Sequence, residues 1–168
     1  MGPERQRFLL LDACVLIDFC QTETAVLRLV VDHVADVFVA TTVLAEVRDF
    51  DEAAAVALGL RLVEPTLDQA FEAASRSGAV SFQDRICLAL ARDNGWTCVS
   101  NDKALRRACE SAGIQVMWGL ELVALLVEAG ALTASAGREI GMAIRRVNRF
   151  ITEEVLSRLL LRIGMGSQ

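Results

Sequence analysis

Histidine is almost missing from this chain of 168 residues, with His33 as its single copy. One histidine cannot build a histidine-rich zinc site, and we expect His33 on a helix surface near Asp36 rather than in a catalytic triad. The sequence also lacks a glycine-rich phosphate loop, which excludes P-loop nucleotide hydrolysis. Any catalytic chemistry has to come from other side chains.

Paired cysteines are missing as well. The five cysteines are scattered along the chain, and none belongs to a CxxC pair. Their odd number excludes a complete internal disulfide framework, and each lies in an apolar pattern where a free thiol behaves as a small hydrophobic group. We therefore expect buried, reduced thiols in a cytoplasmic protein.

The chain has no long hydrophobic run. The apolar run at residues 8–11 is too short for a signal peptide and ends at Asp12. The most apolar stretch, residues 119–132, is interrupted by Glu121 and Glu128, which argues against a membrane span. We expect no association with a membrane.

Positive charge is scarce except near the C-terminus. The net charge is −5, but residues 1–130 carry −8 and residues 131–168 carry +3. This balance argues against a generally cationic nucleic-acid binder. An anionic ligand then has two routes to the protein: a metal ion held by the acids, or the basic tail itself.

Short apolar runs alternate with helical patterns along the first 118 residues. The sequence predicts strands at residues 8–11, 36–40, 60–63, 96–100 and 114–118. It predicts helices after the first strand and at residues 41–58, 66–77, 81–91 and 101–112, then 120–128, 134–146 and 152–162. This alternation indicates an α/β fold, a three-layer α/β/α sandwich with a mostly parallel sheet. We expect one domain over residues 1–130 and a helical extension over residues 131–168.

Two acids directly follow predicted strands. Asp12 comes after the first strand and Asp102 after the fourth, where ligands of open α/β sheets bind. Each acid also has a structural alternative as the cap of the next helix. Ser100 adds a hydroxyl beside Asp102, which could cap that helix or orient a metal-bound water.

Two further acids lie near helix starts. Glu46 has apolar neighbours at helical spacing, so we expect it on or beside the inward face of the helix at residues 41–58. Asp84 closes a capping box that begins at Ser81, and the helix that follows is apolar nearly all round. The alternatives are an edge carboxylate that reaches solvent for Glu46 and a simple capping role for Asp84.

The joint placement of these four acids favours a metal site. Clustered carboxylates repel one another and raise each other's pKa values unless a cation lies between them. Mg²⁺ and Mn²⁺ prefer oxygen ligands, and phosphodiester hydrolysis uses one or two such ions. The sequence therefore predicts a nuclease-type acidic pocket.

Four blocks contain the predicted acids and follow one another along the chain: LDACVLID (11–18), VLAEV (43–47), DRICLALA (84–91) and SNDKAL (100–105). In this order the blocks resemble those of PIN-domain ribonucleases, and in size and layout the chain is similar to VapC-type toxins of toxin–antitoxin systems. The resemblance covers residues 7–118. It implies that Asp12, Glu46, Asp84 and Asp102 bind Mg²⁺ or Mn²⁺, with Ser100 at a position where the family often has threonine.

The resemblance also implies an activity and partners. Family members cleave RNA, and toxin members are inhibited by a cognate antitoxin and commonly form homodimers. Cys14 departs from the family, which usually has a small polar residue there, so we expect a hydrogen bond near the site to be missing. A second hypothesis is an inactive PIN-fold module that acts through protein contacts of its helical tail. Cys14 also replaces the second aspartate that haloacid dehalogenase-type phosphotransfer needs, which argues against that class.

Several other charged residues have open roles. We expect Asp18 to be a solvated helix residue rather than a fifth ligand. Cations beside the predicted pocket could contact phosphates or be ordinary surface charges; they are Arg85, Lys103, Arg106 and Arg107. Tail arginines at 138, 145 and 149 share a helix face if the helix continues that far, and could bind RNA, bind a protein or only face solvent.

Overall fold

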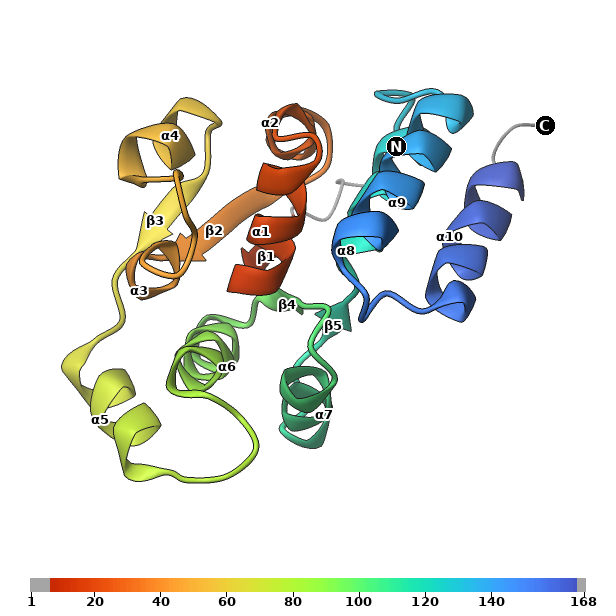
Figure 1. The fold of residues 1–168 in the computed structure, drawn as a ribbon. Helices are drawn as coiled ribbons and strands as arrows, with labels where there is room; N and C mark the ends of the chain where they lie inside the picture. Colours follow the sequence, from red (N-terminus) through yellow and green to blue (C-terminus); the bar gives the residue numbers. More distant parts are fainter. Residues whose placement is uncertain (1–6, 166–168) are drawn as a thin grey trace, which may run out of the picture.

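A five-stranded parallel sheet forms the centre of the molecule (Figure 1). The structure, a computed structural model, describes residues 7–165. The strands are β1 (Phe8–Leu11), β2 (Asp36–Ala40), β3 (Arg61–Val63), β4 (Thr97–Val99) and β5 (Val116–Met117). Their order in the sheet is β3-β2-β1-β4-β5, and every pairing is parallel. The direction of the order reverses between β1 and β4, which is where open α/β sheets bind ligands.

Helices cover both faces of this sheet (Figure 1). In chain order they are α1 (Ala13–Gln21), α2 (Ala25–His33), α3 (Thr41–Leu44), α4 (Glu52–Ala57), α5 (Leu67–Ser75), α6 (Phe82–Asn94), α7 (Lys103–Ser111), α8 (Gly119–Glu128), α9 (Ala134–Val147) and α10 (Glu153–Met165). Helices α1, α2 and α8 lie on one side, and α6 and α7 on the other. The predicted three-layer α/β/α architecture is confirmed.

Strand β1 is buried on both of its faces. Leu9, Leu10 and Leu11 are each at most 1% exposed, because helices pack above and below the strand. A continuous apolar run is the pattern that a central parallel strand requires. The acid that follows this run, Asp12, is therefore carried into the interior of the molecule with the strand.

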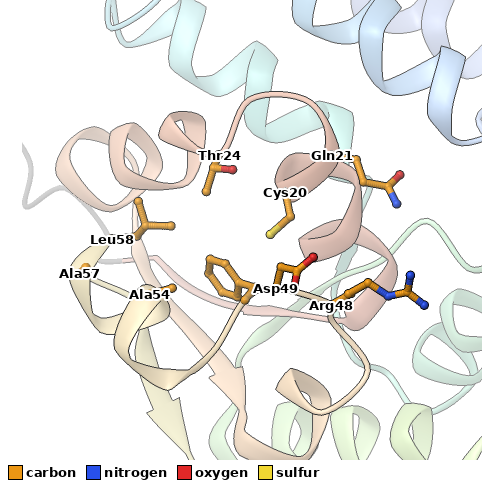
Figure 2. A pocket seen from close by; sticks show the side chains of 9 residues that line it. Cys20, Gln21, Thr24, Arg48, Asp49, Ala54, Ala57 and Leu58 are labelled. Atoms are coloured by element: carbon orange, nitrogen blue, oxygen red, sulfur yellow. The ribbon is translucent and has the colours of Figure 1, made fainter.

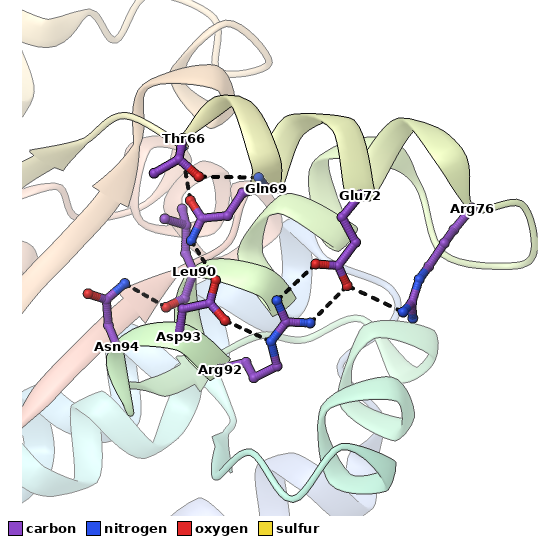
Figure 3. Close-up of polar contacts among 8 residues, drawn as sticks. All are labelled: Thr66, Gln69, Glu72, Arg76, Leu90, Arg92, Asp93 and Asn94. Carbon is purple, nitrogen blue, oxygen red and sulfur yellow. Dashed lines mark hydrogen bonds and ion pairs between the residues drawn. The ribbon is translucent and has the colours of Figure 1, made fainter.

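Helices α5 and α6 are joined by a polar network at their outer faces (Figure 3). Gln69 Nε2 donates to Asp93 Oδ2 at 2.9 Å, and Arg92 forms an ion pair with Glu72 at 2.8 Å. The ion pair is largely exposed and contributes little to stability. The network lies across the contact between α5 and α6, the helix that begins near Asp84.

The C-terminal helices pack into the same hydrophobic core as the sheet. Buried residues of this part, including Ile144, Ile151 and Ile163, belong to the cluster that contains β1. Helix α9 approaches α10 closely at Gly141, where an added Cβ would lie 2.6 Å from Leu159 Cδ2. A larger residue there would force the Leu159 side chain to shift within the contact between the two helices.

The helix predicted at residues 41–58 is wrong in its middle. The chain forms α3, then a turn that includes Asp49 with φ of +58°, and then α4. Glu46 therefore lies in an exposed turn and not on an inward helix face. Strands β3, β4 and β5 are also shorter than predicted, and the first helical pattern forms two helices, α1 and α2. Between residues 7 and 165, no helix is long and apolar enough to cross a bilayer.

Candidate metal and nuclease site

Asp12 lies at the carboxyl end of the central strand β1 and is only 3% exposed. Its Oδ1 accepts a hydrogen bond from the Val15 backbone N–H at 3.1 Å, so the residue is the N-cap of α1. Its own backbone N–H donates to the Val99 carbonyl at 3.1 Å. The carboxylate is thus fixed between the ends of β1 and β4, at the point where the strand order reverses.

Ser100 connects Asp12 to the second strand-end acid. Its hydroxyl donates to Asp12 Oδ2 and accepts the Asp102 backbone N–H at 3.0 Å. Asp102 is largely exposed, and its Oδ1 caps α7 by accepting the Leu105 N–H at 2.8 Å. Asp102 is therefore the N-cap of α7, which is the structural alternative that the sequence left open. The structure thus brings Ser100 and Asp102 together as predicted, and the Ser100 hydroxyl is hydrogen-bonded to Asp12.

The charge state of Asp12 reflects its surroundings. Burial raises the pKa of the Asp12 carboxyl from 3.8 to about 6, and hydrogen bonds from Cys14, Ser100 and Val15 only partly oppose this rise. The negative charge of Asp84 raises the pKa further. A carboxylate with these surroundings is stabilised by a nearby cation.

Asp84 and Glu46 act electrostatically on the same region. Asp84 starts α6 in a capping box, in which its Oδ2 accepts the Ser81 N–H at 3.1 Å. Partial desolvation, and after it the charge of Asp84, raise the pKa of Glu46. Asp84 thus influences both Asp12 and Glu46, although β1, α3 and α6 are far apart in the sequence.

Two buried oxygen atoms on the same elements have no hydrogen-bond partner among the described residues. They are Thr42 Oγ1, on α3 shortly before Glu46, and Gln83 Oε1, next to Asp84 on α6. An unsatisfied buried polar atom destabilises a fold by about 1–3 kcal/mol. Such atoms near acids can be satisfied by water or by a hydrated ion.

The predicted acids suit a divalent cation in donor chemistry and in charge. Their ligand atoms are carboxylate oxygens, which Mg²⁺ and Mn²⁺ prefer. Among residues 7–165, however, no three His, Cys, Asp or Glu side chains lie close enough together to hold a metal ion. In this conformation the predicted acids are too far from one another for three of them to bind one metal ion.

Cys14 contacts Asp12 directly. Its Sγ lies 2.9 Å from Asp12 Oδ1 and 3.1 Å from Oδ2, and it accepts the Asn101 N–H at 3.3 Å. The expectation of a missing hydrogen bond is wrong, because the thiol supplies a weak donor in place of a hydroxyl. Burial, together with the charge of Asp12, raises the pKa of the Cys14 thiol, so it stays protonated.

Asp18 is buried, and the prediction of a solvated helix residue is wrong. It is 4% exposed, and its Oδ2 accepts from Asn101 Nδ2 at 2.7 Å and Asn148 Nδ2 at 2.8 Å. Burial raises its pKa, and the two amide hydrogen bonds oppose the rise. The sequence shows an asparagine at the end of a helical pattern, but nothing in it pairs Asn148 with Asp18.

The predicted phosphate-binding cations have different surroundings. Arg85 donates to the carbonyls of Ala73 and Val80, so it holds the loop before α6. Arg106 stacks over Trp118 at 3.9 Å and donates to the Ser100 carbonyl at 3.2 Å. Lys103 and Arg107 are exposed. Only the last two have the freedom of surface charges.

One cavity lies beside the end of α1, and a groove lies beside the predicted acid Asp102. A cavity of about 550 Å³ lies between the end of α1 and the turn before α4, lined by Cys20, Thr24 and Asp49 (Figure 2). No predicted site residue lines it. A groove of about 450 Å³ runs beside Asp102 and Cys14 and reaches the segment between α9 and α10. The groove, rather than the other cavity, adjoins the acids.

Comparison with solved structures gives distant likenesses. The chain is similar to a solved PilT N-terminus (PIN) domain protein from the hyperthermophilic archaeon Sulfolobus solfataricus P2, at 11% sequence identity and a TM-score of 0.49. The alignment covers 68% of this chain and 89% of that chain. No protein-family model and no curated protein matches the sequence. A likeness at this level does not assign the chain to a family.

Proposed function

We propose that this protein is a metal-dependent endoribonuclease that hydrolyses RNA phosphodiester bonds. The observation that carries the proposal is Asp12: a buried carboxylate at the reversal point of a parallel sheet, with its pKa raised to about 6. Such a group is costly to keep ionised unless a cation is bound nearby. The four sequence blocks that resemble PIN-domain ribonucleases support the same activity.

Mg²⁺ or Mn²⁺ would be held by Asp12, Glu46, Asp84 and Asp102. When bound, such an ion lowers the pKa of its water and stabilises the leaving oxygen of the phosphodiester. The ion would also bring the repelling charges of Asp84 and Asp12 into a favourable arrangement.

The remaining contacts of the site have positioning roles. Ser100 orients Asp12 by donating to Oδ2, and the Asp102 N–H in turn orients the Ser100 hydroxyl. The cap contact with Val15 fixes the other oxygen of Asp12. A ligand held through two oxygens presents one geometry, which is what precise placement of a reacting phosphate requires.

A cleavage assay tests this proposal. Labelled total RNA is incubated with wild type or Asp84→Asn in Mn²⁺, Mg²⁺ or EDTA. Asparagine can still accept the Ser81 N–H, so the helix cap is preserved. We expect cleavage that needs both the metal and Asp84. Equal cleavage by the two proteins would contradict the site assignment.

The finer proposal is a VapC-type toxin with a cognate antitoxin and a homodimeric, cytoplasmic state. It rests on the size of the chain and the order of the four blocks. A small reading frame directly upstream of the gene, encoding a protein that inhibits cleavage, would support the toxin. Its absence would favour a stand-alone nuclease.

The second candidate is an inactive PIN-fold binding module. It is favoured by the hydrogen bonds that Asp12 already accepts from Ser100, Cys14 and Val15, which satisfy the carboxylate without a metal. Such a protein would act through its C-terminal helices. Absence of cleavage, together with absence of stabilisation by Mn²⁺ or Mg²⁺, would establish this alternative over the nuclease.

A further inference from the structure

A tight turn joins α9 to α10 and presents two side chains to solvent. The Ile151 N–H donates to the Asn148 carbonyl at 3.1 Å, and the Phe150 N–H donates to Asn148 Oδ1 at 2.9 Å. Asn148 and Ile151 are buried, while Arg149 and Phe150 between them are exposed. Phe150 is 72% exposed, an unfavourable position for a phenyl ring that has no partner.

This turn is anchored to the element that begins at the acidic site. Asp18 on α1 accepts one hydrogen bond from Asn148 in the turn and one from Asn101, two residues after the end of β4. Asn101 Oδ1 also accepts the Gly119 N–H at 2.9 Å. One buried carboxylate therefore fixes the distance between the turn and the segment that carries Asp102.

The groove of about 450 Å³ lies between these two fixed segments. Asp102 and Lys103 line one side, and Arg149, Phe150 and Thr152 line the other. Within residues 7–165, neither Lys103 nor Arg149 forms an ion pair or a side-chain hydrogen bond. The groove thus combines two available cations with an exposed aromatic ring, next to an acid of the proposed site.

We propose that this groove binds single-stranded RNA, with a base stacked on Phe150 and phosphates at Arg149 and Lys103. The inference rests on the proposed nuclease function and identifies where its substrate strand lies. Aromatic rings flanked by cations bind single strands because every base has a face that can stack, whereas bases in a duplex are already stacked. The groove runs beside Asp102, so an RNA strand bound in it would pass close to the proposed metal-binding acids.

The test is binding in EDTA, where no metal-dependent cleavage occurs. The probe is a fluorescein-labelled oligouridylate of about 12 nucleotides, followed by fluorescence anisotropy, with an RNA duplex of the same length for comparison. We expect Phe150→Ala to bind the single strand roughly 5- to 100-fold more weakly than wild type. Phe150→Trp should restore binding, and its indole fluorescence should be quenched by the stacked base.

Matched controls separate stacking and charge from general surface effects. Phe71 on α5 is 77% exposed and does not line the groove, so Phe71→Ala should bind as wild type does. Arg149→Ala should reduce the magnitude of the slope of log affinity against log salt by about 0.7, as loss of one phosphate contact on a single strand does. Arg146→Ala, an exposed arginine on α9 outside the groove, should leave that slope unchanged.

The outcomes distinguish the groove from the activity. The groove proposal is overturned if Phe150→Ala binds the single strand as tightly as wild type. It is also overturned if neither wild type nor any variant binds the single strand, even when the protein cleaves RNA. If binding depends on Phe150 but wild type cleaves nothing with Mn²⁺, the groove proposal stands and the nuclease fails. Equal affinity for duplex and single strand would also overturn it.

Discussion

Two buried aspartates on the same short segment have opposite surroundings. Asp18 accepts two amide hydrogen bonds from Asn101 and Asn148, and no other acid is among the causes that shift its pKa. Asp12 accepts from a hydroxyl, a thiol and one backbone N–H, and Asp84 adds a repelling charge. Burial is the main cause that raises the pKa of both carboxyls, and only Asp12 also faces the charge of another acid.

Under the proposed function, this difference separates a structural buried acid from a metal-binding one. Amide donors on Asp18 link three distant segments, so this carboxylate holds the C-terminal helices against the sheet. The donors on Asp12 are all local or from the adjacent strand end, so they orient the group without joining distant parts. Burial alone does not identify a functional acid; the charges that face it do.

The largest effect should follow from removing the structural acid. Asp18→Ala leaves the side-chain amides of Asn101 and Asn148 without their acceptor, and we expect a loss of about 4 kcal/mol in the free energy of unfolding. Urea denaturation measures the loss. Glu139→Ala, at an exposed acid on α9, is the control and should change stability by less than about 0.5 kcal/mol. A loss below about 1 kcal/mol for Asp18→Ala would remove the contrast with Asp12.

Removing the charge of Asp12 should have the opposite sign. Because its pKa is about 6 in the folded state and 3.8 ordinarily, the folded protein binds more protons between these pH values. Wild-type stability in EDTA should therefore fall by about 3 kcal/mol as pH rises through this window, and then level off. Asp12→Asn keeps the helix cap and lacks this fall, so it should be the more stable protein at pH 7.

The difference between the two pH profiles isolates Asp12, because Asp18 contributes equally to both proteins. Chemical denaturation at a series of pH values from about 4 to 8 provides the profiles. Parallel profiles for wild type and Asp12→Asn would contradict a raised pKa of Asp12 in the folded protein.

An intermediate effect on stability should come from the contact between α9 and α10, the two helices on either side of Asn148. In Gly141→Ala the new methyl group meets Leu159 on α10, and overpacking of this kind lowers stability by about 2 kcal/mol. Gly164→Ala on α10 has open space around its Cβ and should be neutral or slightly stabilising. Thermal unfolding of both variants measures the difference. Equal stabilities would indicate that α9 and α10 are loosely packed.

The smallest effect should come from the thiol beside Asp12. Cys14→Ser replaces a weak S–H donor by a hydroxyl, which binds an ionised carboxylate more strongly. We expect a lower pKa for Asp12 and a gain in stability of up to about 1 kcal/mol at pH 7. Carboxyl NMR titration follows the pKa. Cys20→Ser, at a half-buried thiol further along α1, should leave it unchanged.

The central strands could be predicted because they are short and mostly apolar. β1 has no polar residue, β2 has only Asp36 at its start, and the bounds of both strands match the prediction. The break after Leu44 could not be predicted, because Asp49 adopts a positive φ inside a sequence with helical spacing. The exposed position of Glu46 follows from that break.

The candidate site could be predicted only in part. Asp12 and Asp102 follow strands, and parallel strands end at the same edge of a sheet, so their proximity is readable from the sequence. The hydrogen bond between Asp18 and Asn148 could not be predicted, because 130 residues separate them and each has an ordinary local role. Tertiary contacts between polar side chains leave no periodic pattern.

The most direct test of a metal site at Asp12 is the response of the thermal midpoint to Mn²⁺ in three proteins: wild type, Asp12→Asn and Asp18→Asn. A metal that binds only the folded state raises this midpoint. We expect a rise for wild type and for Asp18→Asn, which starts from a lower midpoint, and no rise for Asp12→Asn. A rise in Asp12→Asn equal to that of wild type would contradict a metal site at Asp12.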